Sequence, residues 1–390
     1  MLDGLDLSFE DGDSDLRSGG GRHRRRKSRL GRSLLTLLIV VAMLGLLGAG
    51  GYYGVTKVRA FFTAPDYTGA GYGSVQVQVK PGDAAAEIAN TLYDKGVVKS
   101  AKAFVDAANS NPNSRNIQPG FYQLAKHMKA SLAVTGLLDP SKRVVTKVTI
   151  PEGYTTNRIL SMLSEKLKLP LSDFQKAAKD PGSLGIPDSW YQRDDGKKAN
   201  KTVEGFLFPT TYEFDPGTTA QDALTQMVAM FMTQASKAGL DKVSGMSPFE
   251  ALIVASLGQA EGIPSDFPKI TRVVYNRLND NDQPWLKKLQ FDSTTNYWLD
   301  LKGKGAKQSS GLTSAELNDP SNPYSTHAHA GLPPGPIDNP SFEAMKAAAS
   351  PASGNWVYFV RIDKAGHSAF TNDYNKFLDY QALARSRGVL

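Results

Sequence analysis

The sequence predicts an α+β protein with a single N-terminal transmembrane helix, a small module and a larger mixed α+β domain. Three observations carry this prediction. No charged residue lies between Arg32 and Lys57, a strand–turn–helix pattern occurs twice, and helices alternate irregularly with short strands from residue 144 onward. The predicted parts are a disordered cytoplasmic tail at 1–32, a transmembrane helix at 33–54, a linker at 55–73, a module at 74–140 and a catalytic domain at 141–390.

The composition excludes several classes of protein. Of the 390 residues, 41% are hydrophobic and 21% are charged, which is typical of a folded chain rather than a disordered or collagen-like one. Cysteine is absent, so disulfide frameworks, thiol nucleophiles, iron–sulfur clusters and cysteine-ligated zinc are excluded. The formal net charge of +7 is compatible with a partner that is a nucleic acid or another anion. The positions of the basic residues along the chain show whether a nucleic acid is expected.

The N-terminal segment predicts a membrane anchor. Six acidic residues lie within 1–16 and eight basic residues within 17–32, with few apolar residues among them. The uncharged run at 33–54 is long enough to span a hydrocarbon core, which needs about 20 residues. Because the basic block precedes this run, the positive-inside rule places the N-terminus in the cytoplasm and the catalytic domain on the outer face of the plasma membrane.

Two alternatives compete with an anchor. A cleaved signal peptide has an apolar region of about 7–15 residues after a short basic segment, whereas here the tail and the apolar run are both longer. A buried helix of a soluble domain is the other alternative. The length of the run favours the uncleaved anchor.

The segment 74–140 predicts a small β-α-α-β module. Valines alternate with polar residues at 75–79, as in a half-buried strand, and helical spacing of apolar residues follows in two stretches. Residues 120–124 predict the returning strand and 132–138 a further helix. A similar strand, turn and helix follows at 148–163, where Gly153 lies 71 residues after Gly82. Two similar supersecondary units explain this pattern at least as well as a duplication does.

One helix of the large domain carries the candidate catalytic residue. Ser247, Pro248 and Glu250 predict a capped helix start, and the helix then continues almost without polar residues, as a helix buried on all sides does. It ends at Glu261, where Gly262 is predicted as a left-handed C-terminal cap. Desolvation and the helix C-terminus both raise the pKa of a carboxyl group, as a general acid requires. The alternative is that Glu261 simply emerges into solvent.

Two neighbouring segments complete the candidate site. The next helix, 267–278, carries Arg277, which we expect to lie along the surface rather than to pair with a carboxylate. A dense polar cluster follows, beside two aromatic residues, which suits sugar binding. Its members are Gln290, Asp292, Ser293, Thr294 and Asn296. An Asx-type turn before a helix is the alternative for this cluster.

The third segment, 323–337, is too rich in proline and glycine for a helix or a central strand, and we expect a rigid loop that forms one wall of a cleft. His327 and His329, with His367, raise the question of a metal ion, but no helical His-x-x-x-His spacing accompanies them, and we predict no metal and no cofactor. Nucleotide-binding, zinc-protease and serine-hydrolase motifs are absent from the sequence.

The motifs together resemble one family. In order they are ALIVASLGQAEG, VVYNRL, LQFDSTTNY, NPYSTHAHAGLPPGPI and WVYFVRIDKAGHSAF, preceded by VTIPEG and EGFLFPTTY. They resemble the endolytic murein transglycosylases, the YceG-like or MltG family, over about residues 144–375. The resemblance implies one N-terminal transmembrane helix and a LysM-like module, here at 74–140.

The resemblance also implies a reaction. Lytic transglycosylases cleave the β-1,4 bond between N-acetylmuramic acid and N-acetylglucosamine in peptidoglycan without water and leave a 1,6-anhydro-muramyl end. One carboxyl group acts as acid and then as base, here Glu261, whereas ordinary glycosidases need two. The motif positions expected to line the glycan cleft are Gln290, Asp292, Ser293, Thr294, Tyr324, Gly331, Pro333, Pro334 and His367.

Two positions depart from the family pattern. Family members often have a glutamate where this chain has Gln259, which leaves Glu261 as the only candidate on its helix. Asn commonly follows Pro-Tyr in the family, and here the residue is Ser325.

Two other functions are alternatives to catalysis. A non-catalytic, membrane-anchored scaffold could hold peptidoglycan and recruit cell-wall synthases such as penicillin-binding proteins, but the intact helix ending at Glu261 favours catalysis. A nucleic-acid partner is not expected, because the net charge of the chain outside the tail is only +5 and no basic stripe with interleaved aromatic residues occurs there.

Overall fold

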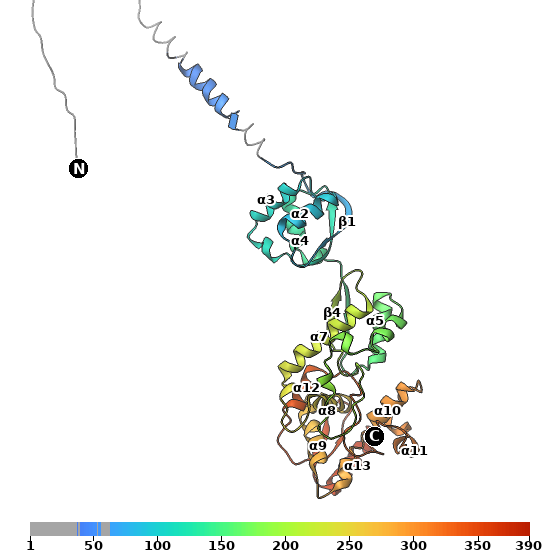
Figure 1. Cartoon of the computed structure of the whole chain (residues 1–390). Helices are drawn as coiled ribbons and strands as arrows, with labels where there is room; N and C mark the ends of the chain where they lie inside the picture. Colours follow the sequence, from blue (N-terminus) through green and yellow to red (C-terminus); the bar gives the residue numbers. More distant parts are fainter. Residues whose placement is uncertain (1–36, 38–39, 53, 56–62) are drawn as a thin grey trace, which may run out of the picture. The chain divides into compact units, whose positions relative to one another are not determined.

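The computed structural model describes residues 37, 40–52, 54–55 and 63–390, and the chain divides into two compact units, 1–67 and 68–390 (Figure 1). Residues 40–52 in the first unit are helical. Within the described part of the chain, no helix combines the length and apolar character needed to cross a membrane. The predicted tail at 1–32 lies outside the described residues, as do 33–36, 38–39 and 53 of the predicted span.

The second unit begins with the predicted β-α-α-β order, which is confirmed. The two strands pair antiparallel, with Val79 opposite Gly120. The first strand starts three residues before the predicted one, at Tyr72, and an irregularity in its register separates this residue from Val75. The elements are β1 (Tyr72–Val79), α2 (Ala85–Asp94), α3 (Ala101–Asn109), β2 (Gly120–Lys126) and α4 (Ala130–Leu138). Whether this module is LysM-like stays a prediction.

The repeated strand–turn–helix pattern is also confirmed. Strand β3 (Thr146–Thr149) leads into α5 (Thr156–Leu167), as β1 leads into α2. Both turns contain a glycine in the left-handed region, with φ of +86° at Gly82 and +71° at Gly153, where a side chain would be strained. The pairing differs between the units, because β3 pairs antiparallel with the distant β4 (Thr211–Phe214).

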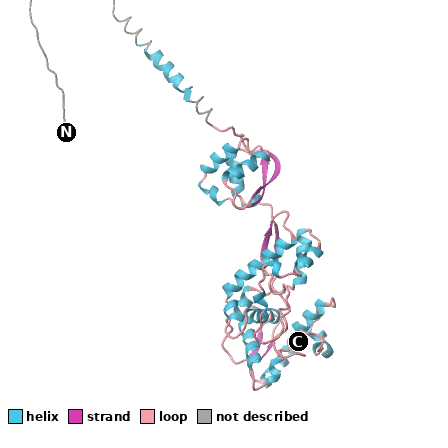
Figure 2. Cartoon of the chain, in the orientation of Figure 1, coloured by secondary structure: helices cyan, strands magenta, loops and turns pink. Residues whose placement is uncertain are grey.

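The larger part of the second unit is built from packed helices, among them α8 (Pro248–Glu261). Helix α12 contacts α7, α8 and α9, and the core of this region includes an aromatic cluster in which Phe206 stacks on Phe249 at 6.4 Å between ring centroids. The packed helices are α6 (Leu171–Ala177), α7 (Ala220–Ala238), α9 (Phe267–Asn279) and α12 (Phe342–Ala349). The structure is a mixed α+β fold in which helices dominate, as Figure 2 shows.

The last elements lie on either side of a long loop. They are α10 (Asp292–Leu301), α11 (Ser314–Leu317), β5 (Tyr358–Arg361), β6 (Ser368–Thr371) and α13 (Tyr374–Ser386). Short 3-10 segments occur at Pro112–Asn116, Pro140–Lys142, Gly182–Leu184, Asp188–Tyr191, Leu240–Lys242, Pro284–Lys287 and Ser309–Gly311. Strands β5 and β6 form an antiparallel hairpin. Residues 318–341 contain neither helix nor strand, which confirms the predicted loop.

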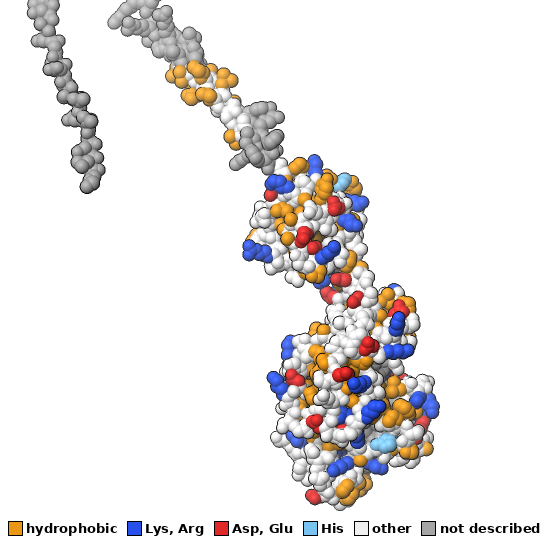
Figure 3. Space-filling view, viewed as in Figure 1, with side chains coloured by type: hydrophobic (Ala, Val, Ile, Leu, Met, Phe, Trp, Pro, Cys, Tyr) orange, Lys and Arg blue, Asp and Glu red, His pale blue; other side chains and the backbone are white. Residues whose placement is uncertain are grey.

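The charged side chains are mixed by sign on the face that Figure 3 shows. Lysine and arginine side chains alternate with aspartate and glutamate over this face. On this face the described residues show no large patch of a single charge sign.

Candidate active site

Helix α8 is built as the sequence predicts at its N-terminal end. The Ser247 hydroxyl accepts a hydrogen bond from the Glu250 amide, the Glu250 carboxylate accepts from the Ser247 amide, and Pro248 occupies the first turn. Ten consecutive residues, 249–258, are buried. The helix therefore carries Glu261 from the middle of the core to its edge, where the carboxyl group is half-buried.

The C-terminal end of α8 differs from the prediction. Gly262 has φ −148° and ψ −169°, an extended conformation that any residue adopts, so it is not a left-handed cap. Glycine is needed here for a different reason. A Cβ atom at this position would collide with Cδ1 of Ile270, which is fully buried on the next helix. A side chain directly after the candidate catalytic residue would therefore require the buried Ile270 side chain to shift.

Helix α10 supplies the groups that surround the Glu261 carboxyl group. The Ser293 hydroxyl donates a hydrogen bond to Glu261 Oε1 at 2.5 Å. Burial is the main cause that raises the pKa of Glu261, and the negative charge of Asp292 raises it further. The Ser293 hydrogen bond and the positive charge of Arg361 act in the opposite direction. The net effect is a raised pKa, which favours the protonated acid.

Asp292 has a partner of its own. Its Oδ1 lies 3.0 Å from Nε2 of His327, and this hydrogen bond is the main cause that lowers the pKa of Asp292. The surroundings of Asp292 therefore favour its ionised form, whereas those of Glu261 favour its protonated form. Neighbouring carboxyl groups with pKa values pushed apart are a recurring arrangement in acid–base sites.

Arg277 is buried, contrary to the expectation that it lies along the surface. It is 7% exposed and donates to the carbonyl groups of Leu286 and Leu289 and to Oε1 of Gln290. Burial lowers its pKa to about 10, which still leaves it charged at neutral pH. Gln290 has φ +56°, a left-handed conformation that is uncommon for a residue with a side chain. The guanidinium group therefore fixes the backbone turn that begins α10.

The loop at 322–341 is held by hydrogen bonds from distant segments. Arg193 donates to the carbonyl of Pro333 at 2.6 Å, and Lys197 donates to the carbonyl of Ala330. The amide of Gly331 donates to the carbonyl of Lys287 at 2.7 Å. The hydroxyl of Tyr324 accepts from Asn200 at 2.8 Å. The loop is held in place because residues of other segments form hydrogen bonds with its backbone and with the Tyr324 hydroxyl.

The far end of the same loop enters the core. The Ser256 hydroxyl of α8 accepts from the amide of Ile337 at 2.8 Å, and Asn339 accepts from the amide of Leu207. Asn339 also donates to Glu204, which is 3% exposed and receives a further hydrogen bond from the Tyr297 hydroxyl of α10. Burial raises the pKa of Glu204 to about 7 in spite of these donors.

Asp338 is a second buried carboxyl group in this region. It is 4% exposed, and its Oδ1 has no hydrogen-bond partner among the described residues. Burial and the negative charge of Glu204 raise its pKa well above the usual range of an aspartate.

The β5–β6 hairpin closes another side of the site. Its turn packs against the segment after Glu261, because a Cβ atom on Gly366 would lie 2.9 Å from the Ile263 side chain and the Ser368 amide donates to Asp266 at 2.7 Å. His367 in this turn is exposed, and its Nδ1 lies 2.8 Å from Asp363. Arg361, which acts on the pKa of Glu261, ends β5.

The predicted site residues divide into three groups. Asp292 and Ser293 lie against Glu261, and Gln290 precedes them with its Oε1 bound by Arg277. Thr294 is fully buried and its hydroxyl donates to the carbonyl of Phe291, so it supports the backbone from within. Tyr324, Gly331, Pro333 and Pro334 line a pocket of about 590 Å³ whose lining does not include Glu261.

The histidines do not meet around a common point. His327 is bound to Asp292, His329 lines the pocket, and His367 is bound to Asp363. Among the described residues, no group of three histidine, aspartate or glutamate side chains is placed to hold a metal ion.

Comparison with known proteins assigns the family. The model of the YceG-like family matches residues 77–382. The chain belongs to the YceG-like family. A Streptococcus pneumoniae protein named endolytic murein transglycosylase is 29% identical over 356 residues, which cover 85% of this chain and 62% of that relative. A Bacillus subtilis protein of the same name is 28% identical over 78% of this chain and 83% of the relative.

A solved structure shows a similar fold. The crystal structure of a YceG-like protein from Listeria monocytogenes is 27% identical to this chain, with a TM-score of 0.51 over 79% of this chain and 99% of that one. The chain thus spans about 62% of the length of the pneumococcal relatives and nearly all of the solved structure.

Sequence reasoning about this YceG-like chain missed several residues of the site. Arg277 looked like a surface residue because the carbonyl groups it binds lie in an irregular segment that carries no pattern. Arg361 and Asp338 also escaped notice. A sequence signal did exist for Glu204, because it lies in the EGFLFPTTY motif and is the only charged residue in an apolar stretch before Glu213.

Proposed function

We propose that this protein is a membrane-anchored endolytic lytic transglycosylase. It cleaves the bond between N-acetylmuramic acid and N-acetylglucosamine in nascent peptidoglycan strands and leaves 1,6-anhydro-muramyl ends. Membership of the YceG-like family and the names of the pneumococcal and Bacillus relatives support this proposal. One observation in the chain carries it, namely the raised pKa of Glu261 at the edge of a buried helix.

The chemistry needs a carboxyl group that is protonated before the reaction. Glu261 is half-buried, and desolvation disfavours its charged form, so its pKa is raised and the protonated form is favoured. In the first half of the reaction Glu261 gives this proton to the glycosidic oxygen as the bond from that oxygen to C1 of the muramyl residue breaks.

The second half of the reaction restores the acid. The C6 hydroxyl of the same muramyl residue bonds to C1, and the Glu261 carboxylate accepts the proton that this hydroxyl loses. No water is consumed, and one carboxyl group acts in both steps. The Ser293 hydroxyl, 2.5 Å from Oε1, stabilises the carboxylate formed between the two steps.

The ionised Asp292 has an electrostatic role in the proposal. Positive charge develops at C1 as the glycosidic bond breaks, and a nearby carboxylate stabilises such charge. His327 keeps Asp292 ionised through its hydrogen bond at 3.0 Å. Gln290 and His367 are the further glycan contacts that the family resemblance implies, at the start of α10 and in the β5–β6 turn.

Product analysis tests the activity directly. The full chain in detergent is incubated with purified glycan strands, and the products are separated and identified by mass. We expect new anhydro-muramyl ends, and we expect Glu261→Gln to lower their rate of formation by about 10³-fold or more while its thermal melt is unchanged. Glu165→Gln is the matched control, because Glu165 is exposed on α5.

Three results would count against the proposal. If the Glu261→Gln variant formed products at the full rate, Glu261 would not be the acid and base of the reaction. Reducing muramyl ends in place of anhydro ends would mean that water attacks C1. Strands that remain intact with the wild-type chain would favour the non-catalytic scaffold that recruits cell-wall synthases.

Membrane anchoring rests on the uncharged run at 33–54 and on the basic block before it. We expect the full chain to stay with membranes in alkaline carbonate and to leave them only in detergent. Release of the full chain by carbonate would contradict the anchor.

A further inference from the structure

The pocket beside the candidate site has an unusual charge. It measures about 590 Å³, within the range of about 300–1,000 Å³ typical of ligand pockets. Three lysines and one histidine line it, Lys197, Lys198, Lys288 and His329, and none of the described residues in its lining is an aspartate or a glutamate. A pocket with only basic ionisable groups attracts anions.

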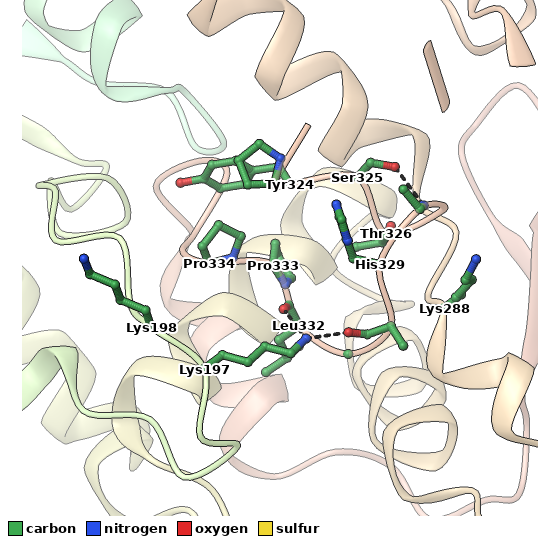
Figure 4. Close-up of a pocket in the computed structure, with 14 residues that line it drawn as sticks. Lys197, Lys198, Lys288, Tyr324, Ser325, Thr326, His329, Leu332, Pro333 and Pro334 are labelled. Carbon is green, nitrogen blue, oxygen red and sulfur yellow. Dashed lines mark hydrogen bonds between the residues drawn. The ribbon is translucent and has the colours of Figure 1, made fainter. Parts of the chain in front are cut away.

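The lysines have different surroundings. Lys197 is tied to the loop, since it donates to the carbonyl groups of Ala330 and Leu332. Neither the Lys198 nor the Lys288 ammonium group makes a hydrogen bond or an ion pair with any residue in the described range 63–390. In Figure 4 these two side chains lie on opposite sides of His329. Two ammonium groups at the pocket are therefore not held by a partner within the described residues.

One acidic residue close in sequence to Lys197 is paired with an arginine. Asp195, two residues before Lys197, accepts from the Arg193 guanidinium at 2.5 and 2.9 Å. Arg193 itself has a fully buried side chain and binds the carbonyl of Pro333. The basic charge of the pocket is thus not cancelled by these neighbours.

The pocket and the candidate site share one wall. Thr326 lines the pocket, and its hydroxyl accepts from the amide of Phe291, directly before α10. The next residue, His327, does not line the pocket and binds Asp292 instead. A polymer bound across Glu261 would therefore run beside the loop that carries the basic pocket.

We propose that the pocket binds a carboxylate of the peptide branches on the glycan strand. The choice of this ligand rests on the proposed function, because the sugars of peptidoglycan are uncharged when the lactyl group carries a peptide, and the carboxylates lie on the peptides. Lys198 and Lys288 then form ion pairs with the peptide, while Lys197 keeps the loop in place. The pocket selects strands that carry peptides.

Binding measured without cleavage tests this inference. Full-length protein with Glu261→Gln, which leaves the strands intact, is titrated with peptide-bearing glycan strands and with the same strands after amidation of their carboxylates. We expect tighter binding of the untreated strands. The double variant Lys198→Gln/Lys288→Gln should reduce this preference by about fivefold, the effect of two partly exposed ion pairs. Lys179→Gln/Lys237→Gln removes the same charge from exposed positions outside the pocket and should keep the preference.

The outcomes separate this inference from the proposed function. A preference that survives in the Lys198/Lys288 double variant, or that is absent before any lysine is changed, would overturn the inference even if the wild-type chain cleaves strands. Loss of the preference in the double variant would support it even if no cleavage is seen. Displacement of strands by millimolar inorganic phosphate, but not by acetate of equal ionic strength, would assign the pocket to a phosphate group and overturn the carboxylate assignment.

Discussion

The two ends of helix α8 each carry a glutamate, and the two side chains have opposite surroundings. Glu250, near the N-terminal end, is 2% exposed and accepts from the Ser247 amide, the Ser247 hydroxyl and the Asp195 amide, each at 2.9 Å. Glu261, at the C-terminal end, is half-buried and has Ser293 as its donor, with the Asp292 carboxylate nearby.

The difference separates a structural carboxylate from a reactive one. The donors at Glu250 bind both of its oxygens at a helix N-terminus, where the helix dipole favours negative charge. Glu261 lies at the opposite pole, and it has fewer donors and a negative neighbour, so its pKa is raised. The same side chain on the same helix therefore serves to fix the fold at one end and, in the proposed reaction, to move a proton at the other.

Glu250→Ala should have the largest effect on stability. The change leaves the Ser247 amide and hydroxyl and the Asp195 amide without an acceptor and removes the capping box, so we expect a loss of about 3 kcal/mol in the free energy of unfolding. Urea denaturation measures it. Glu261→Gln is the comparison and should change the unfolding free energy by less than about 1 kcal/mol, because a neutral amide of similar shape replaces a carboxyl group whose surroundings favour its protonated form. Equal losses for the two variants would abolish the contrast between the helix ends.

Glu204 tests whether hydrogen-bond donors or burial determines the protonation of a carboxyl group. It has donors on both oxygens, yet its pKa is raised from 4.5 to about 7 by burial. The folded chain thus keeps a proton that the unfolded chain releases, and the free energy of unfolding falls as the pH rises from about 4.5 to about 7, by up to about 3 kcal/mol. We expect Glu204→Gln to flatten the pH dependence in this window. Parallel profiles of the variant and the wild type would show that Glu204 is ionised throughout.

Gly262→Ala tests the steric account of the residue after Glu261. We expect a loss of about 2 kcal/mol, because the added Cβ atom collides with Cδ1 of Ile270. Ile270→Val removes that atom. In the Ile270→Val background, Gly262→Ala should lower the free energy of unfolding by less than half as much. A double-mutant cycle measures this difference. Equal costs in the two backgrounds would mean that another contact excludes a side chain.

Ser293→Ala should have the smallest effect and should appear in catalysis rather than in folding. Loss of the hydroxyl removes a donor that lowers the pKa of Glu261, so the pKa rises and the alkaline limb of the rate profile moves to higher pH. We expect a tenfold lower maximal rate, equivalent to about 1.4 kcal/mol, because the carboxylate formed midway is less stabilised. Ser293→Thr, which keeps a hydroxyl, should retain most of the rate. An unshifted pH profile would indicate that Ser293 does not act on Glu261.

Local patterns in the sequence predicted much of the fold. The capped start of α8, its burial on all sides, the two strand–turn–helix units and the irregular loop all follow from capping residues, periodicity and proline content. Such features depend on residues within a few positions of one another, so a single sequence displays them.

The features that the sequence did not predict depend on distant partners. Arg277 is buried because irregular backbone at 286–290 presents carbonyl groups to it, and Gly262 is required because α9 passes close to it. The basic pocket gathers Lys197 and Lys198 with Lys288, about 90 positions later in the chain, around one loop. No periodicity marks such encounters, since only the packed fold brings the partners together.

The attachment of the loop at 322–341 has a consequence for the order of folding. Its hydrogen bonds to Arg193, Leu207 and Ser256 join residues that are 140, 132 and 81 positions apart in the chain. Contacts between such distant positions cost the most loop entropy and form late in folding. Substitutions such as Arg193→Met should therefore accelerate unfolding and leave the refolding rate nearly unchanged. These few hydrogen bonds between residues far apart in the chain would then determine how long the loop at 322–341 keeps its folded conformation.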